Sequence, residues 1–378
     1  MHIQIACDTL GKILHRTQDF LNKNTPEYLA FVLLETTPNG LLKVAATDLE
    51  TSFEGTVQID KLTRQGKILL EGKRLYSFVK SLSVEMIDIN VDESFVASIS
   101  YGKKASVKFH GLDPEIFPKI DASDVDEMAW TEVFCSPIKD LFKKTIFSAS
   151  QDETRVRLTG VFLEGKKGDK ELTSVATDGH RLSLAKRQVC DNGLSNDFSM
   201  IIPRKCVAIV SKLLDSSITM QVAHHKGSFV VKTDSFLVQV RLIDEEFPNY
   251  KSLIPTTDST LYNLPINEVR NILKVMQTLC ERGDKQDDVI NLKIVGKELF
   301  ITYSTSERSF VESVDIENPS NRDLKISYSV KYFVEAMNQV EGEYVKALFG
   351  STELKPTIYK DPKYEHDLFL LMARKGSE

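Results

Sequence analysis

Apolar and polar residues follow one another along this chain with the spacings of both helices and strands. After Asp8, a residue that can cap a helix, apolar side chains recur three and four positions apart and leave Lys12 and Arg16 on the opposite side. Strand-like apolar runs follow at residues 28–35 and 41–46. The sequence therefore predicts an amphipathic helix followed by several strands.

This order of elements occurs three times. The predicted helices carry outward basic residues, which are Lys12 and Arg16, Lys73 and Lys80, Lys139 and Lys143, Lys205 and Lys212, and Arg270 and Lys274. Successive first-helix pairs lie 127 and 131 residues apart, and a Thr-Asp turn at Thr47 returns 130 residues later at Thr177. Such a period is too long for a solenoid. It predicts one domain repeated three times, at residues 1–127, 128–256 and 257–378.

Each repeat contains two predicted helices and a larger number of predicted strands. Hairpin-length connections favour antiparallel sheets, and helices with one apolar face must pack on one side of those sheets. The predicted fold class is therefore α+β, with two helices packed on antiparallel sheets in each domain and the other helix face left free.

Composition narrows the class of protein. Hydrophobic residues make up 42% and charged residues 27% of the 378 positions, as in ordinary globular proteins. The net charge of −6 argues against a surface that binds nucleic acid everywhere, but it permits a basic stripe on one face. We expect no signal peptide and no membrane span, because no apolar run reaches the needed length. Five widely spaced cysteines without a C-x-x-C pair favour reduced thiols and a cytoplasmic location.

The repeated basic pairs predict contact with a polyanion. Two like charges four residues apart disfavour an isolated helix, and a solvated helix face would normally mix the signs. The same positive pair occurs in all three repeats of an acidic chain. No Gly-rich phosphate loop, aromatic RNA-binding motif or base-reading helix accompanies the pairs, so we expect contacts with phosphates and no sequence readout.

The segment from Val175 to Leu182 is the most distinctive turn. Gly179 can supply the positive φ of a tight hairpin corner, and that structural role is the simplest interpretation. A catalytic alternative would use Asp178, His180 and Arg181 as acid, base and anion holder, but no nucleophile motif accompanies them. The remaining histidines lack metal-ligand spacing. We therefore expect no enzyme activity, no metal and no cofactor.

The residues from Ala176 to Leu182 closely resemble the signature of the bacterial DNA polymerase III subunit beta, the sliding clamp. The resemblance extends over nearly the whole chain. It includes Thr47-Asp48-Leu49-Glu50, Phe117-Pro118, Gly160, Ile202-Pro203-Arg204-Lys205, Phe247-Pro248-Asn249-Tyr250 and the C-terminal strand. It implies the DNA clamp fold, with two chains closing head to tail into a ring.

The implied function is a processivity factor that encircles duplex DNA without sequence preference and tethers other proteins. The implied partners are the DNA polymerase III alpha subunit, the clamp loader, other proteins with clamp-binding motifs, and a second copy of the chain. The alternative that remains is a monomeric peptide-binding scaffold that never encircles DNA.

The resemblance also assigns residues. A partner-peptide groove between the second and third domains would include Leu158, Thr177, Gly179, His180, Arg181, Leu182, Pro248, Leu253, Leu354, Pro356 and Met372, with His180 and Arg181 at its rim. Lys23, Gln151 and Arg155 would join the basic helix residues in facing DNA, and Val107, Phe109 and Leu279 would close the ring. The chain departs from the family at Ser252, where an Arg is common, and in its last strand, which reads Leu371-Met372-Ala373-Arg374 where the family often has a Met-Pro-Met-Arg-like sequence.

Overall fold

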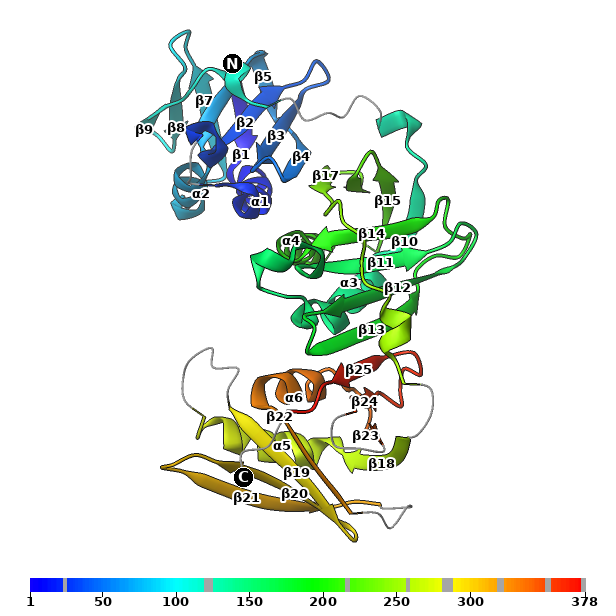
Figure 1. Cartoon of the computed structure of the whole chain (residues 1–378). Coiled ribbons are helices and arrows are strands. Elements are labelled where there is room, and N and C mark those ends of the chain that lie inside the picture. The colour runs from blue at the N-terminus through cyan, green and yellow to red at the C-terminus, as the bar shows by residue number, and fades with distance from the viewer. Residues whose placement is uncertain are drawn as a thin grey trace.

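The computed structural model describes residues 1–22, 26–118, 125–214, 218–255, 259–280, 288–317, 323–350 and 355–374. Figure 1 shows three similar domains that follow one another along a crescent, with helices on the inner side. We call them domains 1, 2 and 3 in chain order. The predicted α+β class is confirmed, because each domain combines two α-helices with antiparallel strands. No helix within these ranges is long and apolar enough to cross a membrane.

Domain 1 contains the first nine strands and two helices. They are β1 (His2–Ala6), α1 (Cys7–Thr17), β2 (Phe31–Thr36), β3 (Leu41–Thr47), β4 (Thr51–Gln58), β5 (Lys61–Arg64), β6 (Lys67–Glu71), α2 (Gly72–Ser81), β7 (Met86–Val91), β8 (Val96–Tyr101) and β9 (Ala105–His110). The apolar face predicted for the first helix is buried: Leu10, Ile13 and Leu14 are each no more than 3% exposed.

Domains 2 and 3 repeat this order. Domain 2 contains β10 (Thr131–Phe134), α3 (Cys135–Thr145), β11 (Gly160–Gly165), β12 (Glu171–Thr177), β13 (Arg181–Gln188), β14 (Phe198–Pro203), α4 (Arg204–Leu213), β15 (Thr219–His225), β16 (Ser228–Lys232) and β17 (Phe236–Arg241). Domain 3 contains β18 (Ser259–Pro265), α5 (Ile266–Gln277), β19 (Val289–Val295), β20 (Glu298–Ser304), β21 (Ser309–Asp315), β22 (Leu324–Ser329), α6 (Val330–Met337), β23 (Tyr344–Gly350), β24 (Thr357–Lys360) and β25 (Leu368–Leu371).

Two sheets continue from one domain into the next. One eight-stranded sheet has the order β10-β15-β16-β17-β4-β3-β2-β6, and its β17–β4 pair joins domain 2 to domain 1. The other has the order β14-β11-β12-β13-β25-β24-β23-β18, and its β13–β25 pair joins domain 3 to domain 2. Each junction is therefore a run of backbone hydrogen bonds as well as a contact between side chains.

Two smaller sheets lie at the ends of the crescent. The five-stranded sheet β5-β1-β7-β8-β9 ends at β9, and the four-stranded sheet β21-β20-β19-β22 ends at β21. Both strands pair on one side only among the described residues. An edge strand presents unpaired N–H and C=O groups that can accept another strand.

A buried cation reinforces the junction between domains 2 and 3. Lys144 of α3 is fully buried, and its Nζ lies 3.1 Å from a carboxylate oxygen of Glu341 and donates to the carbonyl of Gln339. The hydrogen bond from Lys363, together with Lys144, lowers the pKa of Glu341 from 4.5 to about 2, although burial opposes the shift. Because Lys144 belongs to domain 2 and its partners to domain 3, this network fixes the position of one domain against the other.

We expect Lys144→Met to lower the free energy of unfolding by about 3 kcal/mol, since the change removes a buried charge from its partners. Lys363→Met is the control, because Lys363 also binds Glu341, at 2.9 Å, but its side chain is 54% exposed. The control should cost less than about 1 kcal/mol. Urea titrations of both variants measure the two losses of unfolding free energy. Equal losses of unfolding free energy in the Lys144 and Lys363 variants would contradict the role of Lys144 at the domain junction.

The same ion pair should make stability depend on pH. The pKa of the Glu341 carboxyl is depressed in the folded chain, so the stabilisation by its ion pairs is present above pH 4.5 and is lost as the pH falls towards about 2.

Candidate functional site

The turn after β12 is closed by its own side chains. The Asp178 carboxylate accepts hydrogen bonds from the backbone amides of His180 (2.9 Å) and Arg181 (3.1 Å). The Thr177 hydroxyl donates to the Arg181 carbonyl at 2.6 Å, and Gly179 has a φ of +89°. The positive φ explains the glycine, because other residues adopt this conformation at a cost. The hairpin-corner interpretation of this segment is confirmed.

Arg181 is buried, so its expected place at an exposed rim is wrong, while a hydrogen bond from it to a peptide stays a prediction. Its side chain is only 5% exposed. The guanidinium binds the carboxylate of Asp178 at 3.0 Å and that of Glu335, and it lies 4.3 Å from the ring centroid of Tyr332. Glu335 and Tyr332 belong to α6. Arg181 therefore ties β13 of domain 2 to the second helix of domain 3, a role that sequence reasoning missed.

His180 and Arg181 both pack on Tyr332, but only His180 is open to solvent. The residue is exposed, and its ring stacks on Tyr332 with 6.4 Å between centroids. Its carbonyl accepts a hydrogen bond from the Met372 amide at 2.9 Å. The chain just after β25 is thereby held against the turn, so His180 and Met372 lie on neighbouring backbone segments from two domains.

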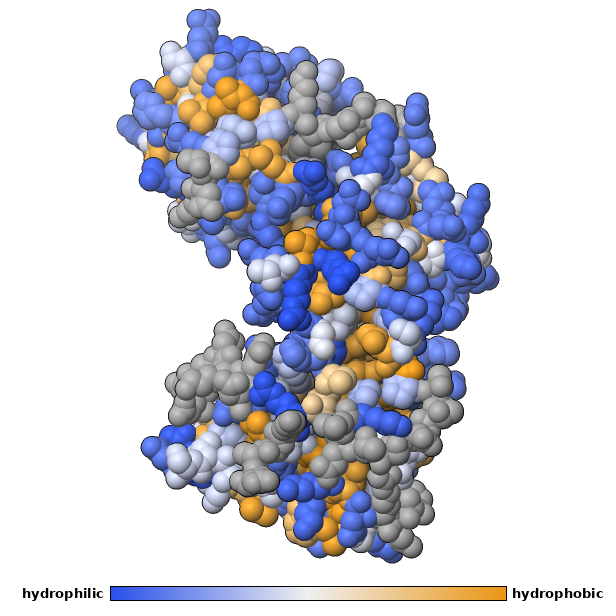
Figure 2. All heavy atoms as spheres, in the orientation of Figure 1, coloured by the Kyte–Doolittle hydropathy of each residue, from blue (hydrophilic) through white to orange (hydrophobic). Residues whose placement is uncertain are grey.

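An apolar floor lies below these segments. It is a buried cluster drawn from domains 2 and 3, made of Val175, Leu182, Ile201, Phe247, Tyr250, Ile358, Leu368 and Leu370. Leu182 is 2% exposed and Leu158 is 8% exposed, so neither offers open surface. The exposed apolar side chains are Leu253, at 50%, and Met372, at 40%. Figure 2 shows apolar residues reaching the surface at this junction.

The other predicted groove residues lie close to this floor along the chain. Pro248 is half-buried between Phe247 and Tyr250, and Pro356 is half-buried immediately before β24. Leu354 lies outside the described residues. Ser252, at the position where the family often has an Arg, donates its hydroxyl to the Asn249 carbonyl at 2.8 Å. We call the surface made by His180, Leu253 and Met372 over the floor the junction groove.

Gln151 and Arg155 lie beside the same turn. Both are exposed, and they line a small cavity together with Asp178, His180, Lys331 and Tyr332. The Arg155 guanidinium donates to the Asp178 carbonyl at 3.2 Å. Their predicted position facing DNA stays a prediction, while their contact with the turn is a feature of the structure.

The basic helix residues fall into two groups. The exposed ones are Lys12, Lys73, Lys80, Lys143, Lys205, Lys212 and Lys274, while Arg16, Lys139 and Arg270 are half-buried. Lys23 lies outside the described residues. The helices α1, α2, α4 and α6 lie along the inner side of the crescent in Figure 1. Basic residues of several repeats thus belong to helices of this inner side, and their position facing DNA stays a prediction.

Arg270 has a structural role that the sequence pattern does not predict. Its guanidinium donates to the carbonyls of Met337, at 2.7 and 3.1 Å, and Val340. Those carbonyls lie at and beyond the end of α6, where the regular helical hydrogen bonds stop. Burial lowers the pKa of Arg270. Arg270 therefore caps the second helix of its own domain, and its expected position facing DNA stays a prediction.

Lys205 and Lys212 join domain 2 to domain 1. Lys205 binds the buried carboxylate of Asp48, and Lys212 binds Asp19 at 2.9 Å. Burial alone would raise the pKa of Asp48, but hydrogen bonds from Lys205 and Thr51 outweigh it and the pKa is lowered. These two lysines therefore have carboxylate partners within the chain, with which a DNA phosphate would have to compete.

The three predicted ring-closing residues lie beside the two free sheet edges. Val107 and Phe109 are half-buried on β9. Leu279 follows α5, and its carbonyl accepts a hydrogen bond at 2.9 Å from Arg308, the residue before β21. The structure thus places the predicted pair and its predicted counterpart at opposite ends of the crescent. Among the described residues, no group of three or more His, Cys, Asp or Glu side chains could hold a metal ion.

Family models of the DNA polymerase III beta subunit match nearly the whole chain. The N-terminal, central and C-terminal domain models match residues 1–121, 133–249 and 251–372. A beta sliding clamp from Halalkalibacterium halodurans is 30% identical over 324 residues, which are 84% of this chain and 82% of that protein. A beta sliding clamp from Bacillus subtilis is 27% identical over 322 residues, which are 84% of this chain and 83% of that protein.

Solved structures share the fold. A DNA polymerase sliding clamp from Bacillus subtilis matches with a TM-score of 0.90 at 24% identity, and the DNA polymerase III subunit beta from Pseudomonas aeruginosa matches with a TM-score of 0.89 at 23% identity. Each match covers 100% of both chains. The three matching domain models and the extent of these similarities agree with the threefold repeat and with the elements described above. The chain therefore belongs to the family of DNA polymerase III beta subunits, the beta sliding clamps.

Proposed function

We propose that two copies of this chain close head to tail around duplex DNA and hold other proteins to it through the junction groove. The observation that supports this proposal is the pairing rule at the domain junctions. At each junction, the last strand of one domain pairs with the strand that follows the Thr-Asp turn of the preceding domain: β17 pairs with β4, and β25 pairs with β13.

The same rule predicts a third pair. β4, β13 and β21 begin at Thr51, Arg181 and Ser309, which are equivalent positions of the three repeats. β9 of domain 1 is the equivalent of β17 and β25, yet β9 and β21 are both edge strands and lie in different end domains. A second copy satisfies both edges at once, because each copy offers β9 at one joint and β21 at the other. Such a closed, symmetric arrangement is the common form of homodimers.

The internal junction gives the register of the third pair. The third residue of β4, Phe53, faces the third residue of β17, Val238. The equivalent residues at the free edges are Val107 of β9 and Val311 of β21. Val311 is 69% exposed, which is unusual for a valine in a strand and leaves apolar area to bury against the partner's Val107.

We expect Val311→Lys to weaken dimerisation at least about tenfold, because the joint would have to desolvate a charge opposite an apolar residue. Val295→Lys is the matched control: Val295 belongs to the same sheet and is 39% exposed, but it lies at the turn end of β19. Sedimentation over a concentration series measures both dissociation constants. A variant at Val311 that dimerises as tightly as the unchanged chain would exclude the proposed joint.

The inner surface would contact DNA through exposed lysines without gripping it. Lys12 lies 2.5 Å from Asp8, but both side chains are 76% exposed, so this pair can exchange with a phosphate at little cost. Lys143 and Lys274 are exposed at the second pair position of their helices. Exposed charges are screened by salt, which permits sliding, while ring closure keeps the protein on the DNA.

The variant Lys12→Glu, Lys143→Glu, Lys274→Glu should shorten retention on a closed circular plasmid by about tenfold or more, since phosphate contacts are replaced by repulsion. The control changes Lys166, Lys167 and Lys170 to Glu, because these residues are exposed in the turn between β11 and β12. Gel filtration of preformed complexes measures retention, and linearising the plasmid should release both proteins. Equal retention by the two variants would overturn the role of the lysines.

The junction groove would bind short peptides of partner proteins by apolar anchors. Its floor is preformed, and Leu253 and Met372 supply exposed apolar surface above it. We infer that the DNA polymerase III alpha subunit, the clamp loader and other motif-bearing proteins are its occupants, an inference that rests on the family. The monomeric scaffold is less favoured, because it leaves the two matched edges of β9 and β21 without a role.

We expect Leu253→Ser with Met372→Ser to weaken binding of labelled pentapeptides that carry two adjacent large apolar residues by about tenfold, which is ~1.4 kcal/mol. Ile218→Ser is the control, since Ile218 is 87% exposed just before β15. Fluorescence anisotropy measures the affinities. Leu182, which the sequence predicts as apolar surface for an anchor side chain, is buried, so a change there would disturb the core as well as the groove. An unchanged affinity in the double variant would remove the groove assignment.

A further inference from the structure

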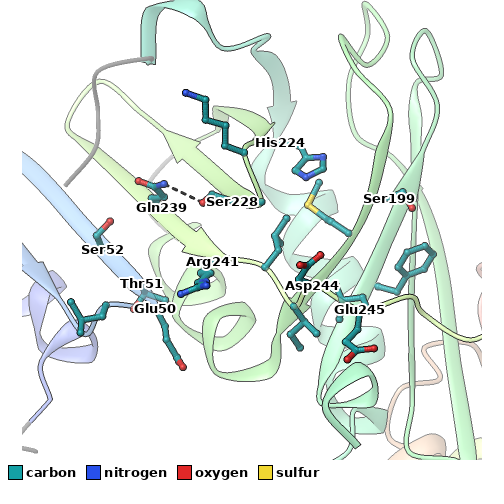
Figure 3. Close-up of a pocket in the computed structure, with 18 of the residues that line it drawn as sticks. Glu50, Thr51, Ser52, Ser199, His224, Ser228, Gln239, Arg241, Asp244 and Glu245 are labelled. Atoms are coloured by element: carbon teal, nitrogen blue, oxygen red, sulfur yellow. Dashed lines mark hydrogen bonds between the residues drawn. The ribbon is translucent and has the colours of Figure 1, made fainter. Parts of the chain in front are cut away.

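A cavity of about 1090 Å³ opens at the junction between domains 1 and 2. Figure 3 shows Glu50, Thr51 and Ser52 along one wall, with Asp244 and Glu245 on the opposite wall and Arg241 between them. His224 and Ser199 lie further along the cavity in the same view. Its volume is that of a site for a small molecule or a short peptide.

This cavity is the repeat-related counterpart of the junction groove. The strand pairs at the two junctions share one register, so positions can be matched through the backbone. The matched pairs are Thr47 with Thr177, Leu49 with Gly179, Ser52 with Leu182, Pro118 with Pro248, Gln239 with Leu370, and Arg241 with Met372. The same architectural position therefore occurs twice in one chain.

The chemistry of the two positions differs. In the junction groove, Leu182 faces Leu370 across the strands and contributes to a dry floor. In the cavity between domains 1 and 2, Ser52 faces Gln239, whose amide donates to the Ser228 hydroxyl at 3.1 Å. Phe162, Ile201 and Phe247 line the same cavity, so its walls combine these polar side chains with apolar surface, whereas the floor of the junction groove is apolar. A lining of both kinds favours a ligand that carries polar as well as apolar groups.

The charge of the rim favours a cation. Four exposed carboxylates line the cavity, at Glu50, Asp244, Glu245 and Glu246. None of them forms a salt bridge among the residues that the structure describes. Arg241 and Lys226 are the cationic lining residues, so acids outnumber bases by two. Burial, with the neighbouring His225, lowers the pKa of His224, which is therefore neutral at pH 7.

One apolar residue stands at this rim in an unusual conformation. Leu49 is 54% exposed and has a φ of +75°, at the position where the other junction has Gly179. A leucine in the left-handed region is strained, whereas glycine would be free of that strain. The rim thus combines an exposed leucine with acidic side chains, which is the complement of a segment that carries both apolar and basic residues.

We propose that the cavity between domains 1 and 2 is a docking site for an extended, Lys- or Arg-bearing segment of a partner protein. The basic side chains pair with Asp244, Glu245 and Glu50, and an apolar side chain packs on Leu49. The same acidic rim repels DNA. Because the cavity and the junction groove lie in one chain, a partner that carries both kinds of segment gains avidity from holding both. Binding in this cavity does not depend on what the junction groove binds.

The test uses the full chain and two labelled hexapeptides, Lys-Leu-Arg-Lys-Leu-Lys and the same peptide with Glu at every basic position. Fluorescence anisotropy at about 150 mM salt limits long-range attraction. We expect saturable binding of the basic peptide alone. Asp244→Asn with Glu245→Gln should weaken it by about tenfold, and Leu49→Ser should weaken it by a smaller factor.

Two controls separate this site from general attraction and from the junction groove. Glu93→Gln with Glu132→Gln removes the same charge from exposed positions elsewhere and should change the affinity by less than about twofold. Leu253→Ser with Met372→Ser should leave the basic peptide unaffected, so failure of one site is distinguishable from failure of the other. The proposal is overturned if the basic peptide does not saturate, if both acidic double variants weaken it equally, or if the acidic peptide binds as tightly.

Discussion

Backbone pairing across the domain boundaries is the constraint on which this structure depends. β17 pairs with β4 and β25 pairs with β13, so each domain is joined to the next through a ladder of hydrogen bonds with a single register. A slip of one residue would turn every side chain of the joining strand to the opposite face, and this fixes the angle between successive domains. Two of the three equivalent strand pairs form within the chain. The strands that correspond to the third pair, β9 and β21, are edge strands at the two ends. The helices, the inner lysines and the junction groove all take their positions from this arrangement.

Side chains then make the two junctions different. Between domains 2 and 3, Lys144 is fully buried, Arg181 is 5% exposed, and Arg187 binds the buried Asp367 with two hydrogen bonds of 2.6 and 2.8 Å. Removing one member of such a buried pair is costly, so these cations resist any change in the relative position of the two domains. Between domains 1 and 2, Lys205 is 56% exposed and Lys212 is 66% exposed. The junction between domains 2 and 3 is thus held by buried ion pairs, while the junction between domains 1 and 2 has more exposed ion pairs and an open cavity.

The sequence contains most of the fold but only part of the site. Apolar spacing identified α1 and its outward lysine, and the equal intervals between basic pairs identified three domains, because both signals are local or periodic. The role of Arg181 was missed because Glu335, its partner, lies 154 residues away and nothing near Arg181 indicates that carboxylate. Arg270 was missed for a related reason: a long basic side chain can reach water or turn back to helix carbonyls, and charge pattern alone does not distinguish them. Leu182 was expected to offer apolar surface to a peptide, but its place opposite Leu370 could be seen only once β13 and β25 were paired.

Small-angle X-ray scattering on a size-exclusion peak of the unchanged chain tests the central claim most directly, since it reports mass and the distribution of interatomic distances together. If β9 of each copy pairs with β21 of the other, the particle has twice the mass of the chain and a distance distribution depleted at the centre, as for an open ring. A particle that stays monomeric as the concentration is raised, or a dimer that scatters as a compact body without a central hole, would contradict the account.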